Sequence, residues 1–261
     1  MKLYDLSQPL NQEVFFWPYY PPFEVKFIKR KPEHGVNAQY IQTSNHIGTH
    51  LDAPRHFVTG GMTIDEIPLE WLYGPGVIVD LTDEMDDLAI YTPEMIERRV
   101  EVREGDILIL HTGWHRYAQF GAEPDEERYI LLHPGPHADM VPWLLEKKIH
   151  IWGLDAVSTD HPMNLPIGRF LGKGMFGQCD RVRAKCEAKF GKDQVDRLFP
   201  EEDYQLTHNA LFPHNCIHIE NMGGQISAPE LQNRRLTIGC FPWKFKGGEA
   251  AFARAVAFVE E

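Results

Sequence analysis

Apolar and polar side chains alternate in two stretches near the start of the chain, at residues 24–30 and 37–44. Alternation with a period of two is typical of a strand that buries one face, so both stretches predict half-buried strands. Three later stretches are almost continuously apolar, which predicts more deeply buried strands. They are residues 76–81, 106–110 and 149–154.

Helices are predicted between and after these strands. Thr92, Pro93 and Glu94 place a capping residue, a proline and an acid before an apolar pattern, which is a typical helix start. Residues 136–148 carry apolar side chains on one side and predict a second helix, although Pro142 lies in its early turns. Both helices are expected to pack on the sheet. Further helical pieces are predicted at residues 181–190 and 194–199.

The composition fits one large α/β domain over residues 1–261. Hydrophobic residues make up 43% of the chain, which is ample for a core, and no repeat or long linker marks a boundary. A net charge of −12 argues against nucleic acid and anionic membranes as partners, because both would repel the protein. The chain begins without an apolar leader and holds no membrane-length apolar run, so we expect a cytoplasmic protein.

The four cysteines show no Cys-x-x-Cys spacing, and metal-binding or disulfide roles are therefore not expected. Free thiols of this kind are usually buried and pack as small apolar side chains. The prediction covers Cys179, Cys186, Cys216 and Cys240.

Candidate chemistry is concentrated in residues 45–56, which hold three histidines and an aspartate. In a straight strand, the α-carbons of His46 and His50 would lie ~13 Å apart, too far to bind one ion. A helix is opposed by the glycine and the β-branched residues between the two histidines. The chain is therefore expected to bend at Gly48, which tolerates unusual backbone dihedrals.

This bend would bring His46, His50 and Asp52 together, with Pro54 stiffening the exit and directing His56 towards the same place. Imidazoles and carboxylates are the usual ligands of catalytic divalent metals. Any one of these histidines alone would more often be a surface or hydrogen-bonded residue. Their combination around a glycine favours a metal site.

The pattern His-x-Gly-Thr-His-x-Asp-x-Pro-x-His, which starts at His46 and ends at His56, resembles the signature of the cyclase-like metal-dependent hydrolases. This family includes bacterial kynurenine formamidase and isatin hydrolase. The likeness runs from the Tyr-Asp-Leu-Ser segment at Tyr4 to the alanine-rich end of the chain. The resemblance implies a mixed central β-sheet or barrel-like β core flanked by helices. It also implies a strand at residues 250–259, where alanine content alone favours a helix.

By resemblance, His46 and His50 would bind one metal and His208 a second, with Asp52 and Glu220 shared between them. The resemblance implies zinc or manganese, as one or two ions per subunit, and a homodimer or homotetramer. Without it, His208 and Glu220 would be read as ordinary structural residues. His218 remains a rival ligand, because it shares a strand face with Glu220 if the strand alternates.

The expected reaction is hydrolysis of a carbon–nitrogen bond in a small amide or cyclic amide, such as N-formylkynurenine or isatin, by metal-activated hydroxide. His56 is the expected general acid and base, because an imidazole with an ordinary pKa of ~6.5 exchanges protons at neutral pH. The alternative for His56 is an additional ligand or a residue that orients one. Trp17, in an aromatic segment, is expected to line the substrate pocket, although core packing explains such residues equally well.

Two alternatives to an amidohydrolase are a lactone hydrolase on the same scaffold and a metal- or ligand-binding homologue without turnover. The intact His56 favours an enzyme. An insertion at about residues 160–203 separates this chain from compact formamidases and leaves the formylkynurenine substrate open. Some further polar residues after predicted strands are left out of the catalytic set. They are His111 and His115, for which a structural role is expected, and Asp155, Asp160 and His161.

Overall fold

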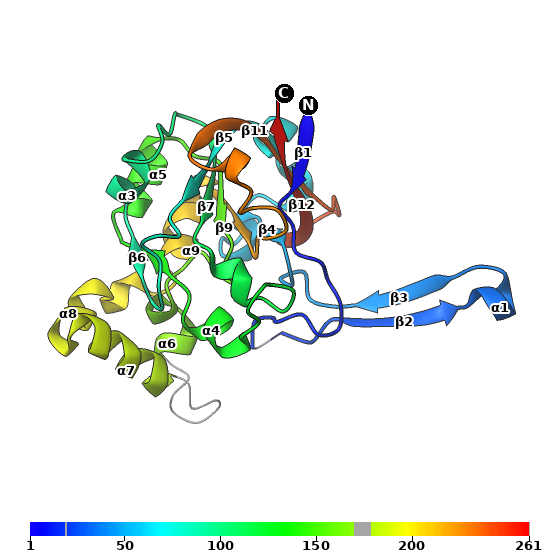
Figure 1. Cartoon of the computed structure of the whole chain (residues 1–261), viewed down its shortest axis with the longest axis horizontal. Coiled ribbons are helices and arrows are strands. Elements are labelled where there is room, and N and C mark those ends of the chain that lie inside the picture. Colours follow the sequence, from blue (N-terminus) through cyan, green and yellow to red (C-terminus); the bar gives the residue numbers. More distant parts are fainter. Residues whose placement is uncertain (19, 170–178, 261) are drawn as a thin grey trace.

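Seven strands form one closed, barrel-like sheet at the centre of the protein (Figure 1). The computed structural model describes residues 1–18, 20–169 and 179–260. An eighth strand, β1 (Lys2–Asp5), pairs antiparallel with β12 outside the ring. In order around the ring, the strands are β12 (Ala250–Val259), β11 (Arg234–Pro242), β5 (Tyr73–Asp80), β7 (Ile107–His111), β9 (Ile151–Leu154), β10 (Ile217–Glu220) and β4 (His50–Asp52).

The sheet is mixed, because β5, β7, β9 and β10 run parallel while β4, β11 and β12 are antiparallel to their neighbours. This confirms the expected α/β class with a barrel-like core. The three apolar runs are the buried strands β5, β7 and β9, as predicted. The strand implied for residues 250–259 is also confirmed, as β12.

Helices cover the outer face of β5, β7 and β9, where they form one apolar cluster with those strands (Figure 1). The helix expected at Pro93 is α3 (Pro93–Glu97). The pieces expected around residues 181–199 are α7 (Cys179–Phe190) and α8 (Lys192–Leu198). The remaining helices are α1 (Lys31–His34), α2 (Leu69–Leu72), α4 (Glu126–Leu131), α5 (Met140–Glu146), α6 (Pro166–Arg169) and α9 (Leu206–Leu211).

The predicted helix at residues 136–148 is too long, since the structure has only α5 within it. Pro136, the first residue of the predicted helix, belongs instead to the short strand β8 (Gly135–Pro136), which pairs with β6 (Ile90–Tyr91). Pro142 is the third residue of α5, where the backbone has no intrahelical N–H bond to lose. The described part of the predicted insertion at residues 160–203 contains α6, α7 and α8, and its status as an insertion stays a prediction.

The strands β2 (Glu24–Lys29) and β3 (Ala38–Gln42) form a hairpin arm that extends away from the barrel, with α1 at its tip (Figure 1). Strands were correctly predicted here, but half-burial was wrong, because apolar side chains on the arm face solvent. Phe27 is 45% exposed and Tyr40 is 47% exposed. Val25 packs at the base of the arm, but among the described residues no layer covers the rest of this two-stranded sheet.

Side chains from all seven ring strands meet in one apolar cluster that fills the closed sheet. Leu51 of β4 and Ile219 of β10 belong to it, so the residues on either side of them point the other way. Alternation therefore puts His50, Asp52 and Glu220 on the opposite face of the sheet. That face carries the candidate site.

Three described cysteine side chains, Cys186, Cys216 and Cys240, are buried free thiols, as expected; the side chain of Cys179 lies outside the described set. Within residues 1–18, 20–169 and 179–260, no helix combines the length and apolar character needed to cross a membrane.

Candidate active site

The chain bends at Gly48, where the sequence predicted a bend. Gly48 has a φ of +61°, and a Cβ atom there would lie 2.4 Å from Cδ2 of Leu10. Glycine is therefore favoured by the dihedral, and a larger residue would also have to displace the side chain of Leu10. The bend leaves the rings of His46 and His50 with centroids 5.1 Å apart.

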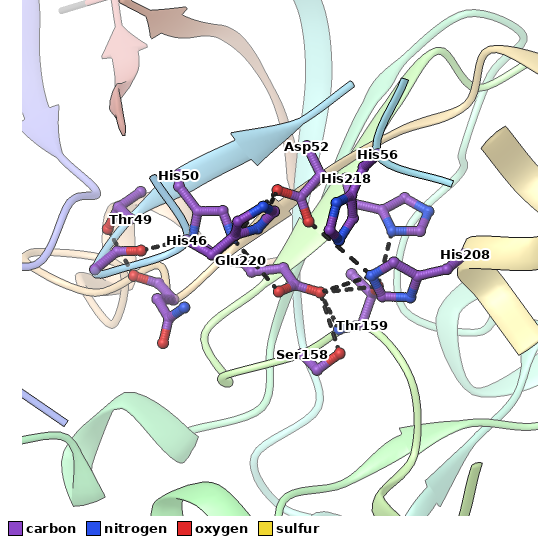
Figure 2. Close-up of polar contacts among 12 residues, drawn as sticks. His46, Thr49, His50, Asp52, His56, Ser158, Thr159, His208, His218 and Glu220 are labelled. Atoms are coloured by element: carbon purple, nitrogen blue, oxygen red, sulfur yellow. Dashed lines mark hydrogen bonds and ion pairs between the residues drawn. The ribbon is translucent and has the colours of Figure 1, made fainter. Parts of the chain in front are cut away.

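The carboxylate of Asp52 lies next to both of these histidines (Figure 2). Its Oδ1 atom is 3.0 Å from Nδ1 of His46 and 3.3 Å from Nε2 of His50. Nδ1 of His50 donates to the carbonyl of Gly48 at 2.8 Å, and its other ring nitrogen, Nε2, faces Asp52. All three side chains are at least nine-tenths buried.

The second half of the site comes from β10 and α9. The antiparallel pairing of β10 with β4 sets Glu220 opposite His50, and Oε2 of Glu220 lies 3.7 Å from Nε2 of His50. α9 brings in His208, whose Nε2 is 3.8 Å from Oε1 of Glu220 and 4.0 Å from Oδ2 of Asp52. His218 shares the strand face of Glu220, as the alternation predicted (Figure 2).

The donor set fits a divalent cation. Both oxygens of Asp52 and Nε2 of His50 are buried without a hydrogen-bond partner in the described part of the chain, which is costly unless a ligand pairs with them. The ligand atoms of His50, Asp52 and Glu220 lie within 4.8 Å of one another. His46 joins a second such group with Asp52 and His56.

The electrostatics agree with this reading. Burial by itself would raise the pKa of the Asp52 carboxyl, but the charges of His46 and His50 hold it well below its usual range. Burial and the neighbouring charge of Asp52 raise the pKa of Glu220. Burial would lower the pKa of His46, yet the charge of Asp52 and a hydrogen bond to Glu249 raise it to about 10. The carboxylates of Asp52 and Glu220 therefore favour positively charged groups beside them, as a divalent cation would be.

Three of the predicted ligands are held by hydrogen bonds to neighbouring residues. Nδ1 of His208 donates to Oδ2 of Asp160 at 2.7 Å, and the backbone N–H of Thr159 donates to Oε1 of Glu220 at 2.7 Å. Nε2 of His46 donates to Oε2 of Glu249 at 2.8 Å. Such contacts fix the tautomer and orientation of metal-binding imidazoles.

His56 follows β4 on a short 3₁₀ helix, Pro54–His56, and its ring lies 4.3 Å from that of His46. Nδ1 of His56 donates to Oε2 of Glu249 at 2.7 Å, so Nε2 is the atom left for proton transfer. The imidazole is partly exposed and lines the cavity described next.

A cavity of about 80 Å³ opens beside these residues. Trp17 and Tyr20 contribute to its wall, and Tyr20 stacks on His46 with ring planes 18° apart. Trp17 also packs against the outer apolar cluster. It therefore lies both in the cavity wall and against the core, the two places considered from the sequence. Other apolar lining residues are Phe57, Val157, Leu165 and Pro166.

The structure brings together all the predicted site residues: His46, His50, Asp52, His56, His208, Glu220 and Trp17. Their chemical roles stay predictions. Two residues that hold the site were not predicted as part of it: Glu249, which has no motif around it, and Asp160. A signal for Asp160 was its place just after a buried strand, where polar residues often face a site.

His111, His115 and Asp155 form a second group whose ligand atoms lie within 4.8 Å of one another, but here the buried polar atoms have hydrogen-bond partners. Asp155 is fully buried, and it accepts from the N–H and hydroxyl of Thr112 and from Nδ1 of His115. Nδ1 of His111 contacts Oε1 of Gln232 at 3.1 Å. No atom of this cluster is among the buried unpartnered atoms of the described residues, which fits the structural role expected for His111 and His115. His161 accepts from the N–H of Met163 and packs on Phe199.

Comparisons with known proteins agree with the geometry. The family described as putative cyclase matches residues 4–161, which include the whole His46–His56 motif. Kynurenine formamidase of Bacillus cereus is 33% identical over 161 residues, covering 60% of this chain and 69% of the relative. The Bacillus anthracis enzyme of the same name is 33% identical over 164 residues, covering 61% and 70%.

Solved structures share the fold over the whole chain. Isatin hydrolase A from Labrenzia aggregata has a TM-score of 0.72 at 22% identity, covering 100% of this chain and 94% of that one. A protein described as a potential metal-dependent hydrolase with cyclase activity has a TM-score of 0.64 at 23% identity, covering 100% and 98%. The match of residues 4–161 and the kynurenine formamidase relatives show that the chain belongs to the cyclase family and has the scaffold of its hydrolases.

Proposed function

We propose that the protein is a metal-dependent hydrolase of the carbon–nitrogen bond in a small amide or cyclic amide. The observation that supports this most directly is the buried group formed by His50, Asp52 and Glu220, in which donor atoms lack partners. A proton-transfer candidate and an aromatic cavity lie beside it. Formamidases and isatin hydrolases among the relatives support the class of reaction.

His46, His50, Asp52, His208 and Glu220 would hold the zinc or manganese ions. A bound divalent cation would supply polarisation of the scissile carbonyl and a water of lowered pKa. His56 would exchange protons through Nε2, first as a base and then as an acid towards the leaving nitrogen. Its orientation depends on Glu249, which holds Nδ1.

The cavity favours an uncharged planar substrate. Its described lining contains several apolar and aromatic side chains but no lysine or arginine. The amino-acid end of N-formylkynurenine would bring a carboxylate that needs such a partner. An isatin-like ring, held between Trp17 and Phe57, would leave no charged group unpaired, so we propose a cyclic amide as the preferred substrate.

The test is to assay the zinc- and manganese-loaded protein against aryl formamides, cyclic imides and lactones, beside the His56→Ala variant. We expect hydrolysis of the cyclic amide, with His56→Ala retaining its metal and losing at least ~100-fold in kcat. Faster turnover of lactones would select the lactone hydrolase. Metal binding without turnover of any substrate would select the binding homologue.

For subunit association, we propose a homodimer or homotetramer in which the hairpin arm is covered by another copy. An isolated two-stranded hairpin is marginal in water, and this one exposes apolar side chains on both faces. They are Phe27, Ile28, Val36, Tyr40 and Ile41, each at least 45% exposed.

A further inference from the structure

His218 is a fully buried side chain of β10 whose Nε2 atom has no hydrogen-bond partner among the described residues. One of its ring nitrogens lies within 4.8 Å of ligand atoms of His208 and Glu220, and all three residues are buried. The rings of His208 and His218 are 4.9 Å apart and nearly perpendicular. A buried imidazole with one unpartnered nitrogen therefore packs beside two of the predicted ligands.

The hydrogen bonds around Thr159 identify the tautomer of His218. The hydroxyl of Thr159 has one proton and lies 3.1 Å from Oε1 of Glu220 and 2.9 Å from Nδ1 of His218. An ionised carboxylate only accepts, so the hydroxyl donates to Glu220 and accepts from Nδ1–H of His218. Nε2 of His218 is then a bare lone pair, which is the form in which an imidazole binds a metal.

An unpartnered imidazole nitrogen alone would be weak support, because His133 has one too. His133 is equally buried and donates from Nδ1 to the carbonyl of Pro134. It differs in its surroundings: within the described chain, His133 belongs to no group of three potential metal-binding side chains. The distinguishing feature of His218 is the pair of donors next to it.

We infer that His218 binds a divalent cation through Nε2, together with His208 and Glu220. This inference rests on the proposed function only in requiring that the site binds a cation. The sequence presented His208 and His218 as rivals; the geometry supports both as ligands of one ion. Thr159 would then orient His218 and Glu220 at once, through its hydroxyl.

A position with two imidazoles has a different metal preference from one with mainly oxygen ligands. Nitrogen donors favour zinc and cobalt, whereas oxygen donors suit manganese and magnesium. We therefore expect the position at His208 and His218 to bind Zn²⁺ or Co²⁺ more tightly than Mn²⁺.

The experiment is a titration of metal-free protein with Co²⁺, followed by calorimetry and by visible absorption, for the wild type, His218→Ala and His133→Ala. We expect the wild type and His133→Ala to bind two equivalents. His218→Ala is expected to bind one of them at least ~10-fold more weakly, with a changed absorption spectrum. Two equivalents bound by His218→Ala with wild-type affinity and spectrum would overturn the inference.

A crystal structure of the zinc-loaded wild type with an anomalous map decides the matter independently of how the variants fold. We expect an ion about 2.1 Å from Nε2 of His218. An ion at His208 and Glu220 that does not contact His218 would refute this inference and leave the proposed function standing. A wild type that binds no divalent cation would refute both.

Discussion

One carboxylate oxygen of Glu249 accepts hydrogen bonds from two histidines, the predicted metal ligand His46 and the predicted acid and base His56. Oε2 accepts from Nε2 of His46 and from Nδ1 of His56, while Oε1 accepts from Asn45 at 2.6 Å. The same side chain thus turns Nδ1 of His46 towards Asp52 and leaves Nε2 of His56 free. Nothing in the chain's spacing announces this, because Glu249 lies 203 positions after His46.

Replacing Glu249 by Gln tests this role. Gln keeps the volume but puts an amide NH₂ in place of one oxygen, so it cannot accept from all three partners. We expect kcat to fall ~10- to 100-fold with a much smaller change in KM, because the orientation of His56 is lost. Glu230→Gln, on an exposed ion pair with Lys2, is the control and should leave both constants unchanged. A normal kcat for Glu249→Gln would count against the role.

Gly48→Ala tests the bend. The alanine must adopt a positive φ, which costs ~1 kcal/mol, and its Cβ also meets Leu10. Gly105→Ala is the matched control, with a φ of +77° and no atom within 4 Å of its Cβ. We expect a larger loss in the free energy of unfolding for Gly48→Ala than for Gly105→Ala, measured in urea, and weaker zinc binding only for Gly48→Ala. Equal losses and equal zinc affinities would show that the contact with Leu10 is unimportant.

At the scale of elements, the hairpin arm shows where a local pattern stops being informative. Residues 24–30 and 37–44 alternate as a half-buried strand should, and they do form strands, yet most of their apolar side chains stay exposed among the described residues. Alternation indicates that one face of a strand will be covered, but it does not identify the surface that covers it.

Introducing lysines on one face of the hairpin arm tests whether another copy of the chain covers that face. Val25 pairs with Ile41, and Phe27 lies on the same face. We expect the double variant Phe27→Lys and Ile41→Lys to sediment as a smaller species than the wild type, because buried lysine is costly in an interface. Phe120→Lys, a control at an exposed position of the body, should not change the species. A wild type that sediments as a monomer would exclude the proposed association.

The sequence predicted the strands best where burial alone decides them, as in β5, β7 and β9. β12 was predicted only through the family resemblance, since alanine content alone favours a helix. In the strand, alanines such as Ala251 and Ala255 are small enough to pack in the apolar cluster inside the closed sheet. The motif from His46 to Asp52 was predictable because its members are neighbours in the chain. Asp160 could be noticed only as a polar residue after a buried strand, and Glu249 not at all, because their contacts come from the folding of distant segments onto one strand face.

At the scale of the whole molecule, two sets of buried histidines differ in what shifts their pKa. His46, His50 and His208 contact the carboxylate of Asp52 or Asp160, whereas burial dominates for His133 and His161. Burial lowers the pKa of His133 to about 4 and that of His161 to about 3. Nδ1 of His161 must also stay unprotonated to accept from Met163.

Acid should therefore destabilise the fold through His161. Its pKa is ~6.5 in the unfolded chain and lower in the folded one, so the unfolded chain binds more protons below neutrality. The stabilisation is complete above pH 7, and about 2 kcal/mol of it should be lost by pH 5. His161→Asn can still accept from Met163 but does not titrate, so its free energy of unfolding should fall less between pH 8 and pH 5. Identical pH dependence for both proteins would contradict the prediction.

The position of β4 between β10 and β12 has a consequence for biosynthesis. The histidine motif leaves the ribosome early, but both strands that flank it belong to the last fifth of the chain. A nascent polypeptide stalled before β10 would present His46 and His50 without Glu220, Glu249 or the closing edge of the barrel. Ion capture by this protein is thus expected to follow the synthesis of β10 and β12, and a chain cut short before β12 would leave β4 unpaired along one edge.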